Sequence, residues 1–189
     1  MQVDTPELLA SYGLFDDGKR VLDLGCGEGF FAWRMKELPI SSYVGMDIRK
    51  DCVKKARQLN LGSRFSFHFI DVANSCYHPN GFQSAEEFSI PCLPEAFDSI
   101  ICHSLFTHLE TEQAASRYVS ECLRALKPNG LLWTTWFRCP PNEPDSSALR
   151  TCYQERFIRE LLSPFQIVME RNGNTDSYHD QWEILAKKP

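Results

Sequence analysis

The chain has 189 residues, which suits a single domain that buries a substantial core without metal or disulfide staples. Its 25 acidic and 20 basic residues give a net charge of −5, and no run of lysines and arginines stands out. The charge therefore disfavours binding to DNA phosphates, whereas it does not exclude a structured RNA as a partner.

Neither a membrane span nor a signal peptide is visible in the sequence. No apolar run approaches the length of a span, and Met1 to Ala10 lacks the basic start and apolar core of a leader, so we expect a cytoplasmic protein. The eight cysteines include no C-x-x-C pair, and the closest two, Cys92 and Cys102, are ten residues apart. We interpret the cysteines as mostly small buried hydrophobic residues of a reducing compartment and assign them no chemistry.

The first predicted element is a short helix within residues 1–18. Asp4 to Glu7 supplies a cap residue, an early proline and an acid three residues after the cap, and Gly13 ends the apolar face that follows. Because only a turn or two of chain precedes the next strand, we expect no large amino-terminal substrate domain.

Val21 to Gly29 reads VLDLGCGEG, an apolar strand that runs into a loop with glycines at positions 25, 27 and 29. Glycine lets the backbone adopt φ > 0 and approach a ligand with no Cβ in the way, at the carboxyl end of the strand. The stretch predicts a cofactor loop, although a plain strand-to-helix bend would use the same glycines.

Two residues in and after this strand indicate which cofactor. A nicotinamide or flavin fingerprint, G-x-G-x-x-G, would place a glycine where the chain has Phe30. Asp23, two residues before the first glycine, suits a ligand with a cationic amino group better than one with phosphates. We therefore predict S-adenosylmethionine.

A helix over Phe30 to Leu38 is predicted to end at Pro39, and a strand over Tyr43 to Ile48 follows. Within this strand, Asp47 lies about twenty residues beyond the glycine loop, where a carboxylate can accept hydrogen bonds from both ribose hydroxyls. The alternative is that Asp47 caps the next helix, Arg49 to Leu59.

The third strand, Phe65 to Asp71, has alternating apolar positions and also ends at an acid. We expect the Asp71 carboxylate to accept a hydrogen bond from the exocyclic amino group of adenine and Val72 to offer its backbone N–H. His68, within this strand, is interpreted as structural. The long irregular stretch Ala73 to Ala96 is expected to form part of the substrate side.

The fourth strand, Phe97 to His103, is nearly continuous in apolar residues, as a buried parallel strand requires. Thr111 then caps a helix that ends at Lys127 to Gly130, and a fifth strand covers Leu131 to Phe137.

The last elements end in a hairpin. A helix from Thr151 to Leu162 leads to a sixth strand, Phe165 to Glu170. Asn172 to Asn174 turns the chain, and Gln181 to Ala186 returns antiparallel.

Strands that alternate with helices predict an α/β fold. We expect one doubly wound, Rossmann-like sheet of seven strands, mostly parallel, with an antiparallel C-terminal hairpin strand, in a single domain over residues 1–189. The ligand then lies at the carboxyl ends of the strands, beside the switch point between the first and fourth strands. The polar residues that close strands at this edge are Asp23, Asp47, Asp71 and His103.

Five motifs follow one another between Val21 and Phe137: VLDLGCGEG, YVGMDI, FIDV, FDSIICHSLFTHL and LKPNGLLWTTWF. In this order they resemble the class I S-adenosylmethionine-dependent methyltransferases. Asn129 stands where the family usually has the first of two glycines, and asparagine tolerates the left-handed conformation. The segment YHPNG before FDSIICHSLFTHL is similar to small methyltransferases of sugar-modifying and cell-surface-glycan enzymes, which implies a saccharide or related metabolite as acceptor.

The residues and the resemblance together predict a cofactor site. Its expected members are Asp23, Gly25, Cys26, Gly27, Gly29, Asp47, Ile48, Asp71, Val72 and His103.

Methyl transfer from a sulfonium is an in-line displacement, so alignment of the acceptor, the methyl group and the sulfur supplies most of the rate. A hydroxyl or ammonium acceptor must also lose a proton, and histidine suits that task near neutral pH. The candidate catalytic residues are His103, expected to touch the methionine moiety, and His108, expected near the acceptor. In related enzymes a histidine that matches His108 serves as base or substrate anchor; the alternative is a helix-start residue bonded to backbone.

In other relatives a histidine at this place joins two acids in an E-x-x-E-H pattern that binds a divalent metal. Here Ser104 and Thr107 replace the acids, so we expect no metal. Tyr12, Tyr77 and Trp136 are either pocket walls or plain packing residues.

Three functions are compatible with these residues. The first is an O-methyltransferase that acts on a small hydroxylated acceptor, with a pocket built from Met1 to Leu14, Ala73 to Ala96 and Arg138 to Arg150. The second is an N-methyltransferase, which needs an amine-binding acid or an aromatic cage. The third is a catalytically silent cofactor-binding subunit. The sequence predicts no membrane partner and leaves the oligomeric state undetermined.

Overall fold

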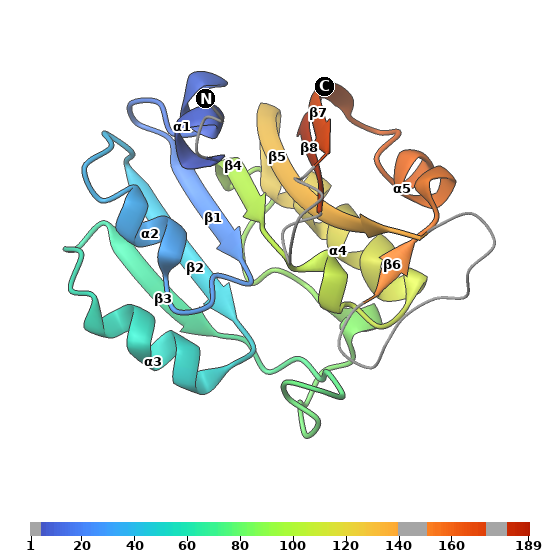
Figure 1. Ribbon diagram of the computed structural model, residues 1–189. Helices are drawn as coiled ribbons and strands as arrows, with labels where there is room; N and C mark the ends of the chain where they lie inside the picture. Colours follow the sequence, from blue (N-terminus) through green and yellow to red (C-terminus); the bar gives the residue numbers. More distant parts are fainter. Residues whose placement is uncertain (1–4, 140–150, 173–180) are drawn as a thin grey trace.

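The computed structural model describes residues 5–139, 151–172 and 181–189 (Figure 1). The predicted α/β fold is confirmed, with the strand order β3-β2-β1-β4-β5-β8-β7 and a short strand β6 paired to β5. The strands are β1 (Arg20–Leu24), β2 (Ser42–Asp47), β3 (Phe65–Phe69), β4 (Phe97–Cys102), β5 (Leu126–Arg138), β6 (Cys152–Tyr153), β7 (Gln166–Asn172) and β8 (Trp182–Lys187). The first five strands pair in parallel, whereas β8 is antiparallel to both β5 and β7.

Helices cover both faces of this sheet. They are α1 (Thr5–Ser11), α2 (Phe30–Arg34), α3 (Lys50–Gln58), α4 (Glu112–Ala125) and α5 (Glu155–Leu161), with two 3-10 turns, η1 (Ala85–Glu87) and η2 (Phe106–His108). Buried residues of α1, α2 and α3 pack in one core cluster, and those of α4 and α5 pack in a second. Along the described ranges, no helix is both long and apolar enough to cross a membrane.

The burial of the strands follows their place in the sheet. The central strand β4 is buried at five of its six positions, as its continuous apolar sequence predicts. The edge strand β7 has no fully buried position among its seven residues. On the helix side, the Thr111 hydroxyl accepts a hydrogen bond from Ala114 N at 3.0 Å, so the predicted cap of α4 is confirmed.

Several boundaries differ from the prediction, those of α2 and β5 most clearly. Helix α2 ends at Arg34, four residues earlier than expected, and turns complete the path to Pro39. Strand β5 begins at Leu126, so the segment expected only to end α4 already pairs with the sheet; within it Asn129 has a φ of 63°, the left-handed conformation. Of the predicted turn at 172–174, Asn172 is the last residue of β7, whereas residues 173–174 and most of the loop 138–150 lie outside the described residues.

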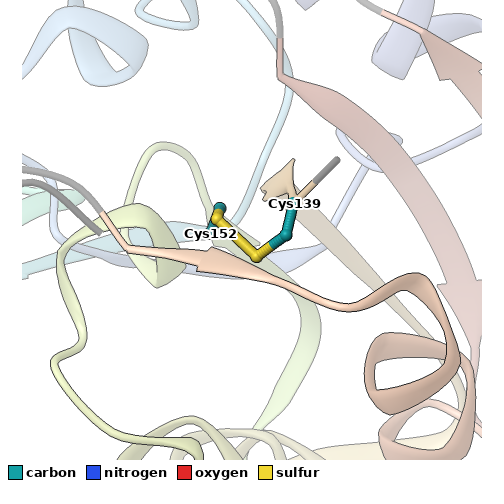
Figure 2. Close-up of a disulfide and its surroundings, with 2 residues drawn as sticks. All are labelled: Cys139 and Cys152. Atoms are coloured by element: carbon teal, nitrogen blue, oxygen red, sulfur yellow. A yellow bond between two sulfur atoms is a disulfide. The ribbon is translucent and has the colours of Figure 1, made fainter. Parts of the chain in front are cut away.

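The region around Cys152 differs most from the prediction. Both the helix expected from Thr151 and the interpretation that the cysteines have no chemistry are wrong there. The start of the predicted helix is instead the strand β6, whose Cys152 is paired in parallel with Phe137, so α5 begins only at Glu155. Cys139 and Cys152 form a disulfide with a Cα–Cα distance of 5.0 Å (Figure 2). Spacing along the sequence missed this bond because the β5–β6 pairing brings two cysteines together across a sequence separation of 13.

The other six cysteines are free. Four of them are buried, as expected for small hydrophobic residues, while Cys76 is exposed and Cys92 is half-buried.

Candidate active site

The glycine loop is fixed to the end of the neighbouring strand. Met46 O accepts hydrogen bonds from Gly25 N at 2.8 Å and from Cys26 N at 3.1 Å. Gly25, Gly27 and Gly29 all have positive φ, at 77°, 53° and 89°. A Cβ on Gly29 would lie 2.8 Å from Leu59 Cδ1 and 3.3 Å from Ala56 Cβ, so a side chain there would have to shift these neighbours and adopt a left-handed φ.

The space beside Gly27 is empty, whereas the space beside Gly29 is filled by neighbouring side chains. Apart from Gly27 itself and its two chain neighbours, no described residue has an atom within 4 Å of the position that a Cβ would take on Gly27. This residue lines a cavity of about 670 Å³ at the carboxyl ends of β1, β2 and β4. The loop therefore presents bare backbone to that cavity.

Most of the predicted cofactor residues surround this cavity. Those that line it are Asp23, Gly25, Cys26, Gly27, Asp47, Ile48, Val72 and His103. The described cavity wall does not include Gly29 or Asp71.

Asp23 is the most deeply buried acid of the site, with 1% of its surface exposed. The Tyr43 hydroxyl donates a hydrogen bond to Oδ2, whereas Oδ1 has no hydrogen-bond partner among the described residues. Burial raises the pKa of Asp23 to about 7, an effect that the Tyr43 hydrogen bond opposes and the nearby charge of Asp47 reinforces. A buried acceptor atom without a partner is costly, so this oxygen fits a cationic donor supplied by a ligand.

Asp47 ties the glycine loop to the end of β2. Its Oδ2 accepts a hydrogen bond from Gly27 N and its Oδ1 accepts one from Arg49 N, both at 2.8 Å. Burial raises the pKa of this carboxyl, while the two backbone hydrogen bonds lower it. The bond to Arg49 N places the carboxylate at the start of α3 as well, although Arg49 itself occupies the N-cap position and forms no side-chain cap bond in the described structure.

Asp71 faces a loop rather than the cavity. Its exposed carboxylate accepts hydrogen bonds from His78 Nε2 at 2.7 Å and from Phe82 N at 3.2 Å, and these bonds lower its pKa. This placement does not support the predicted contact with an adenine amino group. The neighbouring Val72 is buried and does line the cavity.

The two candidate histidines lie on the cavity wall in different settings. The exposed ring of His103 follows β4, stacks on Trp133 at a centroid distance of 5.4 Å and meets Phe31 edge-on at 5.3 Å. The half-buried His108 ends η2, and its Nδ1 lies 3.4 Å from Tyr77 Oη. The described contacts of the His103 ring thus include two aromatic rings, and those of the His108 ring include a phenol oxygen.

Sequence reasoning missed several polar residues that complete the site. The sequence predicts Tyr43 only as the start of a strand, although its hydroxyl binds Asp23. The cavity is also lined by Asn74 and Glu86, within the stretch expected on the substrate side but not singled out there, and by Glu110. Tyr77 lines it, whereas Tyr12 and Trp136 are not part of the described wall.

No group of three or more histidine, cysteine, aspartate or glutamate residues that could hold a metal ion occurs in the part of the chain that the structure describes. Independence from metal stays a prediction.

The fold and the cavity define the class of this protein: it is a class I S-adenosylmethionine-dependent methyltransferase. The chain belongs to the family described as "Methyltransferase domain", whose model matches residues 15–175.

Two curated relatives are similar to part of this chain, and one of them carries a methyltransferase name. An uncharacterized protein of Haemophilus influenzae is 30% identical over 126 residues, 67% of this chain and 45% of its own. The ubiquinone biosynthesis O-methyltransferase of Neisseria meningitidis serogroup A is 28% identical over 116 residues, 61% of this chain and 43% of its own. The chain spans less than half the length of these relatives.

Solved structures share the fold at low identity. A methyltransferase from Methanosarcina mazei has a TM-score of 0.72 at 16% identity, covering 100% of this chain and 99% of its own. Magnesium protoporphyrin IX methyltransferase from Synechocystis, with bound S-adenosylmethionine, has a TM-score of 0.67 at 20% identity, covering 97% of this chain and 75% of its own. The cyclase SpnF has a TM-score of 0.71 at 23% identity, covering 97% and 80%. Because a cyclase shares the fold, the acceptor must be argued from the site.

The residues present fit the cofactor. The unpartnered Asp23 Oδ1 suits its ammonium group, the Asp47 carboxylate retains acceptor capacity for hydroxyls, and the bare backbone of Gly27 leaves room for it. When bound, S-adenosylmethionine supplies an activated methyl group on a sulfonium.

Proposed function

We propose that the chain methylates a hydroxyl group of a small polar acceptor, with His108 as the base. The observation that carries this proposal is that His108 lines the same cavity as Asp23 and Gly27 and has a polar ring contact. In the proposed reaction His108 accepts the acceptor's hydroxyl proton, and the other polar groups of the wall orient the acceptor.

Two features support a hydroxylated acceptor. The wall beside His108 offers the neutral polar residues Asn74, Ser75 and Thr111, which can bind hydroxyl groups. The segment YHPNG, similar to that of glycan-modifying enzymes, supplies Tyr77 to the same wall. A saccharide or a related metabolite is the acceptor class that we propose, and the O-methyltransferase name of the Neisseria relative is consistent with it.

A second candidate is an amine acceptor, because the acids that such an acceptor needs are present. Glu86 lines the cavity, and hydrogen bonds from the hydroxyls of Ser84 and Thr111 lower its pKa and keep it ionised. Glu110 lines the cavity too and accepts a hydrogen bond from Ser75 N at 2.7 Å. With Tyr77 nearby, these carboxylates could bind an ammonium group.

The first test is calorimetric titration with S-adenosylmethionine and with its demethylated product. Micromolar binding is expected for both, and binding of neither would overturn the assignment of the cavity. A screen with [methyl-¹³C]-S-adenosylmethionine then compares neutral sugars and sugar nucleotides with small amines. The carbon shift of the transferred methyl group reports whether it is bonded to oxygen or nitrogen. Label found only on amines would replace the first candidate by the second.

A further inference from the structure

Strand β6 is attached to the end of β5 in two ways. Cys139 N donates a hydrogen bond to Tyr153 O at 3.0 Å, within the parallel pairing of the two strands. The disulfide between Cys139 and Cys152 joins the same two segments covalently (Figure 2). Because β6 has only two residues, its backbone pairing is short. The attachment therefore depends on the disulfide and on the packing of the buried Tyr153 ring.

β6 also holds the turn that contains His108, on both sides of that residue. Immediately before β6, Thr151 N donates a hydrogen bond to Thr107 O at 2.8 Å. Within β6, the buried Tyr153 hydroxyl donates a hydrogen bond to Leu109 O, also at 2.8 Å. The two accepting carbonyls belong to η2 and to the residue that follows it. The position of this turn therefore depends on β6 at two points.

The turn leads into one wall of the cavity, on the side where we propose that the acceptor binds. Aromatic packing braces it as well: Trp136 of β5 stacks on Phe106 of η2 at a centroid distance of 4.0 Å and meets Tyr153 edge-on at 5.5 Å. A shift of β6 would thus reach the wall through hydrogen bonds and through ring packing. The residues that we call the acceptor wall are His108, Leu109, Glu110 and Thr111.

The glycine loop on the opposite side takes its support from another strand. Met46 O accepts the hydrogen bonds of Gly25 N and Cys26 N, and Asp47 accepts that of Gly27 N. Both acceptors lie in β2, which β1, β4 and β5 separate from β6 in the sheet. Release of β6 is therefore expected to change the acceptor wall and to leave the glycine loop in place.

We propose that β6 positions the acceptor wall for methyl transfer, with Tyr153 as a positioning residue, and that the Cys139–Cys152 disulfide makes this positioning sensitive to thiols. Reduction by a dithiol breaks the S–S bond and leaves one thiol on each cysteine. The two electrons and two protons come from the reductant, which becomes a cyclic disulfide. The reduced protein then turns the acceptor over more slowly, because alignment supplies most of the rate. This proposal rests on the proposed function, since it takes the wall around His108 to face the acceptor.

The direct test is amide hydrogen exchange of the full chain, without cofactor or acceptor, before and after treatment with dithiothreitol. Peptide mass spectra first verify the disulfide, and its absence after mild oxidation would overturn the proposal. After reduction, the amides of residues 105–111 are expected to exchange roughly tenfold faster, while those of residues 20–26 keep their rates. Equal rates at 105–111, or an equal increase in both segments, would overturn the proposal.

The matched control for this experiment is the double variant Cys139→Ser, Cys152→Ser. It keeps the size of both side chains and cannot form the bond, so its residues 105–111 are expected to exchange at the fast rate with and without dithiothreitol. Slow exchange in this variant, as in the oxidised wild type, would show that β6 stays in place without the disulfide and would overturn the sensitivity to thiols.

Kinetics with the acceptor found by the screen supply a second readout. Reduction of the wild type is expected to lower kcat/KM for the acceptor roughly tenfold, while the dissociation constant of S-adenosylmethionine stays unchanged. Tyr153→Phe keeps the ring and removes only the hydroxyl bonded to Leu109 O, so the oxidised variant should lose roughly threefold, the effect of one hydrogen bond. Unchanged kcat/KM in the reduced wild type would overturn the proposal, and an unchanged value in Tyr153→Phe would overturn the role of Tyr153.

The exchange experiment separates this proposal from the proposed function. It involves neither cofactor nor acceptor, so transfer of label to amines alone would change the acceptor class without changing the exchange rates. Conversely, equal exchange rates before and after reduction would overturn the role of β6, whereas the methylated atom found by the screen would stand.

Discussion

The cavity has a cofactor side, with Asp23, Asp47 and the glycine loop, and an acceptor side, with His108 and Tyr77. The two sides are formed by different kinds of segment. On the cofactor side, Asp23 and Asp47 are 1% and 8% exposed and bind groups of β2 and the glycine loop. On the acceptor side, Tyr77 is 36% exposed, and the turns around it contact one another through side chains. The cofactor side is thus specified by strand ends, whereas the acceptor side depends on individual loop residues that can change without altering the sheet.

The largest effect is expected from filling the cofactor side. Gly27→Trp should weaken binding of S-adenosylmethionine by ~100-fold or more, because the indole would occupy open space in the cavity. Gly62→Trp is the matched control: Gly62 also has positive φ and open space around its Cβ position, but lies outside the cavity wall. Calorimetry measures both variants, and equal affinity for the two would contradict the assignment of the loop.

An acceptor-side change should leave the cofactor side intact. His108→Ala is expected to lower kcat by about 100-fold or more while the affinity for S-adenosylmethionine is preserved, because base catalysis contributes on that scale. His68→Ala, which changes an exposed histidine on β3, serves as the control and should keep normal turnover. Loss of cofactor affinity in His108→Ala would show that the two sides are not separable.

The pH dependence of binding should report the ionisation of Asp23. Since the pKa of Asp23 is about 7, the carboxylate must lose a proton to pair with an ammonium, and affinity should fall roughly tenfold per pH unit below 7. Burial raises the pKa values of the neighbouring Cys26 thiol and Tyr43 hydroxyl above their ordinary values, so both groups stay neutral over this range. Calorimetry from pH 5 to 8 tests this, and a wild-type profile as flat as that of Asp23→Asn would refute it.

The stability of the cofactor-free folded state should fall as pH rises, whereas the affinity for the cofactor should rise. A carboxyl whose pKa is raised from 3.8 in folding stabilises the folded state most at low pH and loses that contribution as pH rises towards 7. The melting temperature of the wild type relative to Asp23→Asn should therefore decrease between pH 4 and pH 7 without cofactor. An increase over that range would show that the folded protein prefers the ionised form.

The smallest effect is expected at Tyr43. Its hydrogen bond lowers the pKa of Asp23, so Tyr43→Phe should move the midpoint of the binding profile to higher pH. The same titrations measure that midpoint, and an unchanged value would mean that the phenol does not tune the carboxyl.

The sequence predicted the cofactor side better than the acceptor side, for a physical reason. Continuous apolar runs and strand-end acids are local signals, and parallel pairing brings all strand ends to one edge, so the positions of Asp23 and Asp47 follow directly. The contact of Tyr77 with His108 joins residues in two irregular segments, which no periodicity predicts. Asp71, predicted to end the third strand, lies two residues beyond β3, and its carboxylate binds His78 because a nearby loop offers donors that the strand pattern does not reveal.

The disulfide between Cys139 and Cys152 gives the chain a covalent ring. A tryptic cut after Arg150 would open that ring without releasing a fragment, so the nicked protein would run as one molecule until a thiol reductant is added. For protein engineering, the ring is a segment between two fixed attachment points. Residues 140–150 could be exchanged for a segment of another sequence or length while the bond keeps both attachment points at the same Cα separation of 5.0 Å.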